Sequence, residues 1–173
     1  MSFIKDRRTY IILASAWLVA LADPLKAPLL AVAASCALYG LFFSQIASLP
    51  PKAKFWVAAG WSAIAHGAPF AWFATTDFHG VGIVVAYGLL VLLISFQFAL
   101  FSLWLRPKMP IMKILALSGV WALFEWVRLF FMAGYVWNPM GLLMTWHAAP
   151  MQLLSGVGVF GLTFLVMLSN LLF

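Results

Sequence analysis

The sequence predicts an all-α integral membrane protein, a bundle of about six transmembrane helices with its N-terminus in the cytoplasm. Of its 173 residues, 66% are hydrophobic and only 8% are charged, and the mean hydropathy is +1.07, whereas a soluble domain needs far more polar surface. The apolar residues form long runs, unlike the alternating segments of roughly ten residues in a membrane β-barrel. The basic residues are unevenly distributed between the ends of these runs, which indicates a defined orientation.

Six apolar stretches account for most of the chain. A helix needs about 20 mainly apolar residues to cross roughly 30 Å of hydrocarbon, and proline, glycine and charged residues separate the stretches of about this length. The predicted spans are residues 9–22, 27–49, 55–75, 81–104, 114–133 and 151–172. Together they form one transmembrane domain over residues 1–173.

The first span, 9–22, admits a second interpretation. It is short, it follows a basic segment, and Ala20-Leu21-Ala22 matches the Ala-x-Ala pattern at which signal peptides are cleaved. Cleavage would leave five spans in the same orientation, so the charges cannot separate the two possibilities. Mass spectrometry of the mature N-terminus would do so.

The basic residues orient the spans. Eight of the ten Lys and Arg residues precede the first span or lie between spans two and three or four and five: Lys5, Arg7, Arg8, Lys52, Lys54, Arg106, Lys108 and Lys113. The opposite side has only Lys26, and Arg128 lies within a span. Because Lys and Arg are retained on the cytoplasmic side, segments 76–80 and 134–150 are predicted to face outward. This placement explains the net charge of +6 without a nucleic-acid partner.

The fifth span contains two charged residues. Trp121, Glu125 and Arg128 are spaced by four and three, so they share one helix face. A charge in hydrocarbon costs at least about 2.5–3.5 kcal/mol, so this face is predicted to turn inward and its charges to be paired. Two interpretations remain open. The pair could lock the bundle, with help from Asn138 or Gln152, or it could form part of a substrate cavity.

The segment after this span is predicted to lie at the outer membrane surface. Gly134 and Gly141 permit unusual backbone angles, Pro139 stops helix formation, and Trp137 is a residue type that favours the headgroup level. Residues 142–147 mix apolar and polar groups and could rest in the interface. The segment could be a surface anchor or part of a site, and both roles place it at the outer leaflet.

The sequence predicts neither a metal site nor another cofactor. His66, His79 and His147 are not spaced as metal ligands, and Cys36 is the only cysteine. No phosphate-binding glycine loop is present. The phenylalanines of the fourth span are interpreted as bulk that faces lipid or the bundle, and His66-Gly67-Ala68-Pro69 is expected to kink the third span.

Three motifs occur in order near the C-terminal end. They are Trp121-Ala-Leu-Phe-Glu-Trp-Val-Arg128, then Gly134-Tyr-Val-Trp137 with Gly141, then Gly158-Val-Phe-Gly-Leu-Thr163. Together they resemble the membrane portion of the bacterial apolipoprotein N-acyltransferases. Val136 departs from the pattern, because the family has a proline before the tryptophan.

The resemblance implies a multi-pass protein of the bacterial inner membrane. It implies an enzyme that moves an acyl chain from a phospholipid, through a cysteine thioester, to the N-terminal amine of a diacylated lipoprotein. Phospholipid, lipoprotein and the bilayer are the implied partners. The candidates for the substrate cavity or its support are Trp121, Glu125, Arg128, Gly134, Trp137, Asn138, Gly141 and Gln152.

The resemblance assigns no catalytic residue to this chain. The family places its catalytic Glu, Lys and Cys on a nitrilase-like domain that follows the early spans and is absent from these 173 residues. Cys36 lies in the second span with no base nearby in sequence, so it is a poor nucleophile. The chain is therefore expected to be an N-terminal portion or the product of an interrupted reading frame, inactive on its own. The alternative function is a small transporter or channel component, with Glu125 and Arg128 along a polar path.

Overall fold

The computed structural model describes residues 7–74, 80–130 and 138–173, and every regular element in these ranges is helical. The all-α prediction is therefore confirmed for the described part of the chain. The elements are α1 (Arg7–Ala20), α2 (Pro28–Ala33), the π-helix η2 (Ala34–Leu38), α3 (Tyr39–Ile46), α4 (Pro51–Gly67), the 3-10 helix η3 (Ala68–Ala74), α5 (Val81–Ser102), α6 (Ile111–Val127), the 3-10 helices η4 (Arg128–Phe130) and η5 (Met140–Met144), and α7 (Ala148–Leu172).

Each of the six predicted stretches contains helix. Within the described residues, three helical stretches are long and apolar enough to cross a membrane: Pro28–Ile46, Val81–Ser102 and Ala148–Leu172. The helices α1, α4 and α6 have 14, 17 and 17 residues. The six-span topology and the cytoplasmic N-terminus stay predictions.

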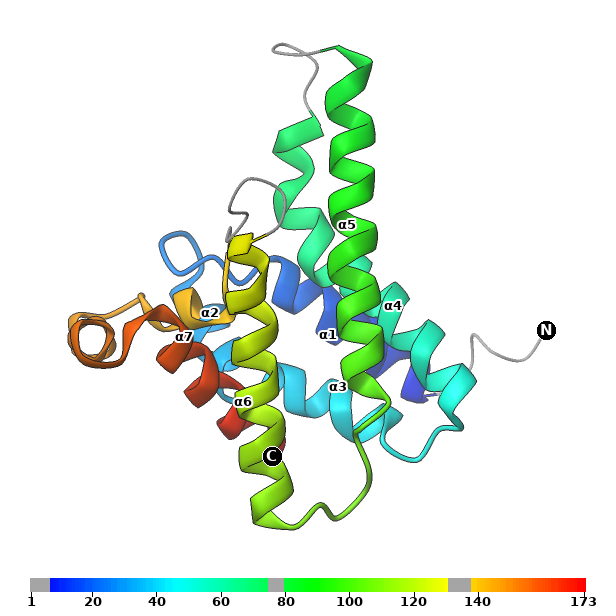
Figure 1. Ribbon diagram of the computed structural model, residues 1–173, viewed down its shortest axis with the longest axis vertical. Coiled ribbons are helices and arrows are strands. Elements are labelled where there is room, and N and C mark those ends of the chain that lie inside the picture. The colour runs from blue at the N-terminus through cyan, green and yellow to red at the C-terminus, as the bar shows by residue number, and fades with distance from the viewer. Residues whose placement is uncertain (1–6, 75–79, 131–137) are drawn as a thin grey trace.

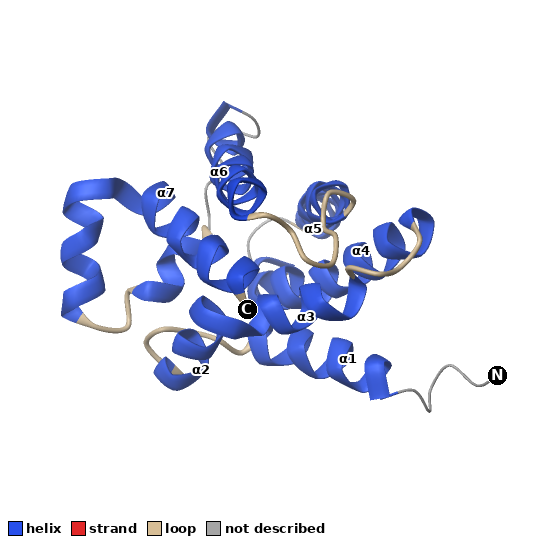
Figure 2. Ribbon diagram, turned by 90° about the horizontal axis from the view of Figure 1, so that it is seen from below, coloured by secondary structure: helices blue, strands red, loops and turns tan. Residues whose placement is uncertain are grey.

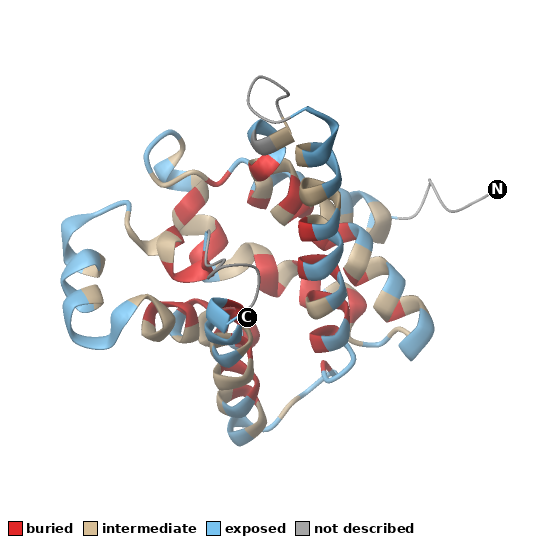
Figure 3. Cartoon of the chain, turned by 45° about the horizontal axis from the view of Figure 1, so that its top comes forward, coloured by how far each residue is buried: buried red, intermediate tan, exposed pale blue. Residues whose placement is uncertain are grey.

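The helices pack around an aromatic core. In Figure 1, α5 and α6 run lengthwise through the molecule, and Figure 2 shows both nearly end-on. Helix α4 packs on α5, α7 packs on α6, and α1 packs on α4 and α3. Phe98 of α5 lies at the centre, with its ring 5.2 Å from that of Trp61 and 5.3 Å from that of Trp121. Such ring pairs contribute about 0.5–1.5 kcal/mol each beyond burial. Figure 3 shows the buried residues on the faces where the helices meet.

A π-helical turn between α2 and α3 is matched by a polar side chain on α7. The wider turn leaves backbone groups without their usual α-helical partners. Asn170 Oδ1 accepts a hydrogen bond from Gly40 N at 2.9 Å, and its Nδ2 donates to the carbonyl oxygens of Ala34 and Ser35, both at 3.0 Å. These hydrogen bonds join the second predicted span to the last one. Asn170 is buried, so they are shielded from solvent.

The third predicted span changes helix type at the expected position. Helix α4 ends at Gly67, and the chain continues as the 3-10 helix η3. Pro69 has no N–H to donate to an α-helical bond and its ring crowds the preceding turn, which gives a physical reason for the change.

The last predicted span is not one straight helix. Gly158 has φ 68° and ψ 174°, which interrupts α7, and Figure 2 shows its two parts running in different directions. Only glycine adopts this backbone conformation readily. The predicted span over 151–172 is therefore helical on both sides of a break at Gly158, and the sequence analysis did not predict this break.

Candidate functional site

Glu125 is held by hydrogen-bond donors from three elements. Trp121 Nε1, one turn earlier on α6, donates to Oε1 at 3.1 Å. The backbone N–H of Met140, at the start of η5, donates to the same oxygen at 3.0 Å. Thr163 Oγ1 on α7 donates to Oε2 at 2.6 Å. The carboxylate is 1% exposed, so these three donors replace the water that it has lost.

Thr163 also joins α7 to the segment around Gly141. Its Oγ1 accepts a hydrogen bond from Gly141 N at 2.9 Å while it donates to Glu125. The backbones approach closely here, because a Cβ on Gly141 would collide with Val159 O and would lie only 2.8 Å from Thr163 N. Gly141 is therefore required for contact between η5 and α7. Glu125 and Gly141 thus belong to one hydrogen-bonded unit.

Arg128 begins η4 at the end of α6 and is 8% exposed. Its Nε donates to Gln97 Oε1 on α5 at 2.7 Å, and Gln97 Nε2 donates to Phe124 O at 2.9 Å. The guanidinium carbon lies 5.6 Å from the centre of the Trp121 ring, a cation–π contact. The side chain of Trp121 thus contacts both charged residues of the predicted face.

Each of the two charged residues has hydrogen-bond partners on other elements. Glu125 accepts from α6, η5 and α7, whereas Arg128 Nε donates to α5. Each buried charge thus connects α6 to other elements. This arrangement fits the interpretation in which the charges hold the bundle together.

A small cavity separates the charged residues from the third span. Its volume is about 10 Å³, close to the space that one water molecule needs. It is lined by His66, Phe70, Ile94, Trp121, Glu125, Arg128, Asn138 and Met140.

A much larger groove adjoins this cavity. It has a volume of about 990 Å³ and runs between the loop after α1, the region around η3, and η5. His66, Phe70, Asn138 and Met140 line both spaces. The other lining residues include Asp23, Lys26, Leu30, Trp72, Leu142 and Met151. The groove is mainly apolar and has charged groups at one edge, so its chemistry suits an amphipathic ligand.

Two side chains fix His66 where the two spaces meet. Its Nδ1 lies 2.9 Å from Ser62 Oγ, and its Nε2 lies 3.3 Å from Tyr39 Oη, both at hydrogen-bond distance. Its ring also stacks on Tyr39, with 5.9 Å between the ring centres. Both ring nitrogens therefore have partners within the bundle.

The loop at the edge of the groove is shaped by Asp23. Its Oδ1 accepts hydrogen bonds from Leu25 N at 2.8 Å and from Lys26 N at 3.0 Å. These two bonds, led by the one from Lys26, hold the pKa of the carboxyl below its ordinary value of 3.8. The charged carboxylate thus stabilises the turn that carries Lys26.

The other residues predicted from the sequence for this site do not all lie near Glu125. Asn138 is exposed, and its φ of 55° is a left-handed conformation that asparagine tolerates better than most residues. Gln152 is exposed in the first part of α7, and its side chain does not line the cavity beside Glu125. Gly134 and Trp137 lie outside the described residues. Of segment 142–147, Leu143 is buried, whereas Trp146 and His147 are exposed.

Two polar partners of the charged residues are not predicted from the sequence. Thr163 belongs to the third family motif without a predicted role, and Gln97 lies in the apolar fourth span. A signal for Gln97 was available, because a Gln inside a long apolar run requires a hydrogen-bonding partner. Thr163 carried no comparable signal, since threonine can satisfy its hydroxyl within its own helix.

The arrangement is suited to holding structure rather than to transferring groups. The three donors occupy Glu125, and Cys36 is exposed on the π-helix, with its Sγ 3.6 Å from Ser35 Oγ. In the described ranges, no three His, Cys, Asp or Glu residues gather as metal ligands would.

Comparison with known proteins identifies the family. The model of the apolipoprotein N-acyltransferase N-terminal domain matches residues 11–172. Searches of curated proteins and of solved structures give no match. The matched range contains Trp121, Glu125, Arg128, Gly141 and Thr163, so the buried hydrogen-bonded unit lies inside the family domain. Since the match extends over nearly the whole chain, this protein belongs to the apolipoprotein N-acyltransferase family and comprises its N-terminal membrane domain.

Proposed function

We propose that this domain binds the phospholipid that donates the acyl chain, in the groove between the loop after α1 and η5. The acyl group would then pass to the N-terminal cysteine amine of a diacylated lipoprotein at the outer face of the bacterial inner membrane. The groove carries the proposal, because its volume of about 990 Å³ combines apolar walls with the charged edge that a phospholipid headgroup requires.

The groove has separate apolar and charged parts, which match the acyl chains and the headgroup of a phospholipid. Leu30, Phe70 and Leu142 offer apolar surface for acyl carbons, and Lys26 lies at the charged edge. Lys26 is exposed and is the only basic residue in the segments predicted to face outward. A lysine beside an apolar groove can contact a lipid phosphate while the acyl chains bury carbon.

Glu125 supports one wall of this groove. By accepting the N–H of Met140 and the hydroxyl of Thr163, it fixes η5 against α6 and α7. Met140 and Leu142 of η5 line the groove. Glu125 is therefore a positioning residue in this proposal, and the chemistry of transfer is assigned to groups outside these 173 residues.

The transporter alternative has weaker support. It requires a wetted path past Glu125 and Arg128, yet the cavity beside them has a volume of about 10 Å³, and three protein donors already occupy the carboxylate.

The proposal can be tested with a phospholipid that carries a photoreactive acyl chain. After reconstitution and illumination, mass spectrometry should locate saturable labelling on Leu142 and Met151. Leu142→Trp, which fills the groove, should reduce that labelling several-fold, and Leu153→Trp serves as the control, because Leu153 is exposed and does not line the groove. Labelling that rises without saturation, or that ignores Leu142→Trp, contradicts a binding groove.

A second assay concerns the chemistry. Purified chain is incubated with phospholipid and a diacylated lipoprotein, and mass spectrometry follows conversion to the triacylated form. We expect no turnover, because the only cysteine of the sequence lies in the second predicted span with no candidate base near it in sequence. Measurable turnover would refute the assignment of chemistry to groups outside this chain without affecting the groove.

A further inference from the structure

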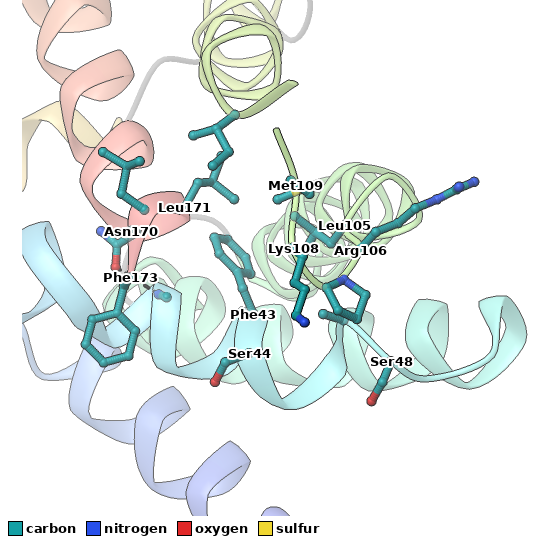
Figure 4. A pocket seen from close by; sticks show the side chains of 15 residues that line it. Phe43, Ser44, Ser48, Leu105, Arg106, Lys108, Met109, Asn170, Leu171 and Phe173 are labelled. Atoms are coloured by element: carbon teal, nitrogen blue, oxygen red, sulfur yellow. Dashed lines mark hydrogen bonds between the residues drawn. The ribbon is translucent and has the colours of Figure 1, made fainter. Parts of the chain in front are cut away.

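A second cavity, with a volume of about 570 Å³, lies where the loop between α5 and α6 meets α3 and the end of α7. Figure 4 shows its lining side chains. None of them lines the groove proposed above. The lining residues are Gly40, Phe43, Ser44, Ala47, Ser48, Leu105–Met109, Ile114 and Asn170–Phe173.

The lining is amphipathic. Phe43, Leu105, Ile114 and Leu171 are buried and give the cavity an apolar inner wall. The outer rim has hydroxyl and basic groups, all of them exposed: Ser44, Ser48, Arg106 and Lys108. A free inorganic anion would contact only the polar rim, whereas a lipid would contact the rim with its headgroup and the apolar inner wall with its acyl chains.

The positive charge extends behind the wall. Lys54 is 5% exposed, and its Nζ donates to Leu105 O at 2.6 Å and to Ala47 O at 3.0 Å. Both acceptors belong to residues that line the cavity. Among the described residues that line it there is no Asp or Glu side chain. The three basic side chains of Lys54, Arg106 and Lys108 outnumber the α-carboxylate of Phe173 in the purified 173-residue chain, so the potential at the rim is positive.

The backbone directs one of these charges toward the cavity. Lys108 has φ 54°, an uncommon conformation for a residue other than glycine and one that tends to occur at functional positions. In Figure 4 its side chain extends toward Phe43 and Ser44 of α3, whereas Arg106 points away from them. Lys108 is therefore the basic group best placed to contact a ligand in the cavity.

We propose that this cavity binds an acidic phospholipid of the cytoplasmic leaflet, distinct from the acyl donor. Lys108 contacts the headgroup phosphate, Ser44 and Ser48 lie beside the headgroup, and the apolar inner wall covers the first acyl carbons. The exposed Trp104 lies just before the rim and is a residue type that favours the headgroup level. Basic cavities between helices on the cytoplasmic side suit anionic headgroups in this way.

Native mass spectrometry tests the proposal. The purified chain is equilibrated in mixed micelles with equal amounts of phosphatidylglycerol and phosphatidylcholine, and the retained lipid is counted. We expect phosphatidylglycerol to be preferred and Lys108→Gln to reduce its retention about fivefold. Lys52→Gln is the matched control, because Lys52 is exposed on the same basic side but does not line the cavity.

Two further experiments complete the test. The first distinguishes binding inside the cavity from binding to a charged surface, and the second distinguishes a bound lipid from a bound free anion. Ser44→Trp keeps every charge but fills the space, so it should also reduce retention, with thermal unfolding in detergent used to confirm that the variant folds. Millimolar glycerol 3-phosphate should not displace the lipid. Equal losses for Lys52→Gln and Lys108→Gln, full retention by folded Ser44→Trp, or displacement by glycerol 3-phosphate would each overturn the proposal.

Discussion

Thr163 Oγ1 donates a hydrogen bond to Glu125 Oε2 at 2.6 Å and accepts one from Gly141 N at 2.9 Å. One hydroxyl thereby connects a buried carboxylate on α6 to the backbone of η5 and to α7. The family motifs that contain Glu125, Gly141 and Thr163 are separate in sequence, and this hydroxyl joins them in space.

The first prediction concerns that hydroxyl. Thr163→Val keeps the shape of the side chain but removes a bond to a charged group, and it leaves Gly141 N without its acceptor. We expect the free energy of unfolding to fall by about 2 kcal/mol, measured by reversible unfolding in detergent. Thr145→Val is the control, because Thr145 bonds only to Leu142 O in its own turn. Equal effects of the two variants would contradict the role given to Thr163.

The second prediction compares two glycines. Gly141→Ala places a methyl group against the backbone of α7, and backbone cannot move aside cheaply, so we expect a loss of about 1–3 kcal/mol. Gly156→Ala meets no atom within 4 Å and should stabilise its helix by up to about 1 kcal/mol. Thermal unfolding of the two variants gives the comparison, and tolerance of Gly141→Ala would show that η5 does not need its close approach to α7.

The third prediction concerns the break at Gly158. Spin labels at exposed positions 149 and 172, introduced after Cys36→Ser, report the distance between the ends of α7. A straight helix would separate these positions by about 34 Å, and the bend should give a shorter distance. Gly158→Ala disfavours the observed φ of 68°, so it should shift the distribution toward the longer distance, whereas Gly156→Ala should not. An unchanged distribution in Gly158→Ala would show that packing, rather than glycine, imposes the bend.

The fourth prediction concerns the π-helix. Asn170→Leu removes the acceptor of Gly40 N and a donor to the carbonyl oxygens of Ala34 and Ser35. Because buried unpaired groups cost about 1–3 kcal/mol each, we expect a loss of about 2–4 kcal/mol in unfolding free energy. Ser44→Ala, which removes two exposed bonds within its own helix, should change it by less than about 0.5 kcal/mol. Because Ser169 Oγ also donates to Ser35 O at 2.6 Å, a small effect of Asn170→Leu would mean that the π-helix does not depend on Asn170.

The fifth prediction concerns acid. The folded-state pKa of Asp23 lies below its ordinary value of 3.8, so its contribution to stability is present above that value and is lost as pH falls through the folded pKa. The thermal midpoint of the wild-type protein should therefore fall at pH below 3.8 by more than that of Asp23→Asn, whose amide oxygen can still accept both bonds. If the thermal midpoints of the two proteins fell in parallel with pH, Asp23 would be excluded as the source of the acid sensitivity.

Apolar length and charge were sufficient to predict the helices. Every predicted span contains helix, because runs of this composition bury their backbone polar groups most simply in helices. The spacing of Trp121 and Glu125 placed them on one face, and the structure joins them by a hydrogen bond at 3.1 Å. Periodicity determines such contacts within one helix.

Contacts between helices could not be predicted in this way. The donors to Glu125 from Met140 and Thr163 depend on where η5 and α7 fold back, and the partner of Arg128 on α5, Gln97, precedes it by 31 residues. The break at Gly158 could not be predicted either, because Gly156, Gly158 and Gly161 are compatible with a continuous helix that packs closely. The predicted roles of Gly134 and Trp137 fall outside the described residues and stay predictions.

The wide spacing of the donors to Glu125 has a consequence for synthesis of the protein. When α6 leaves the ribosome, the carboxylate can reach only groups of its own helix, Trp121 and the predicted partner Arg128, and the threonine hydroxyl follows 38 residues later. On the predicted six-span topology, α6 would until then bear the insertion cost of about 2.5–3.5 kcal/mol for an acidic residue in hydrocarbon. We therefore expect α6 to remain beside the protein-conducting channel, where water can solvate Glu125, and to move into lipid together with α7. In this membrane domain, the order of translation and the order of insertion would then differ.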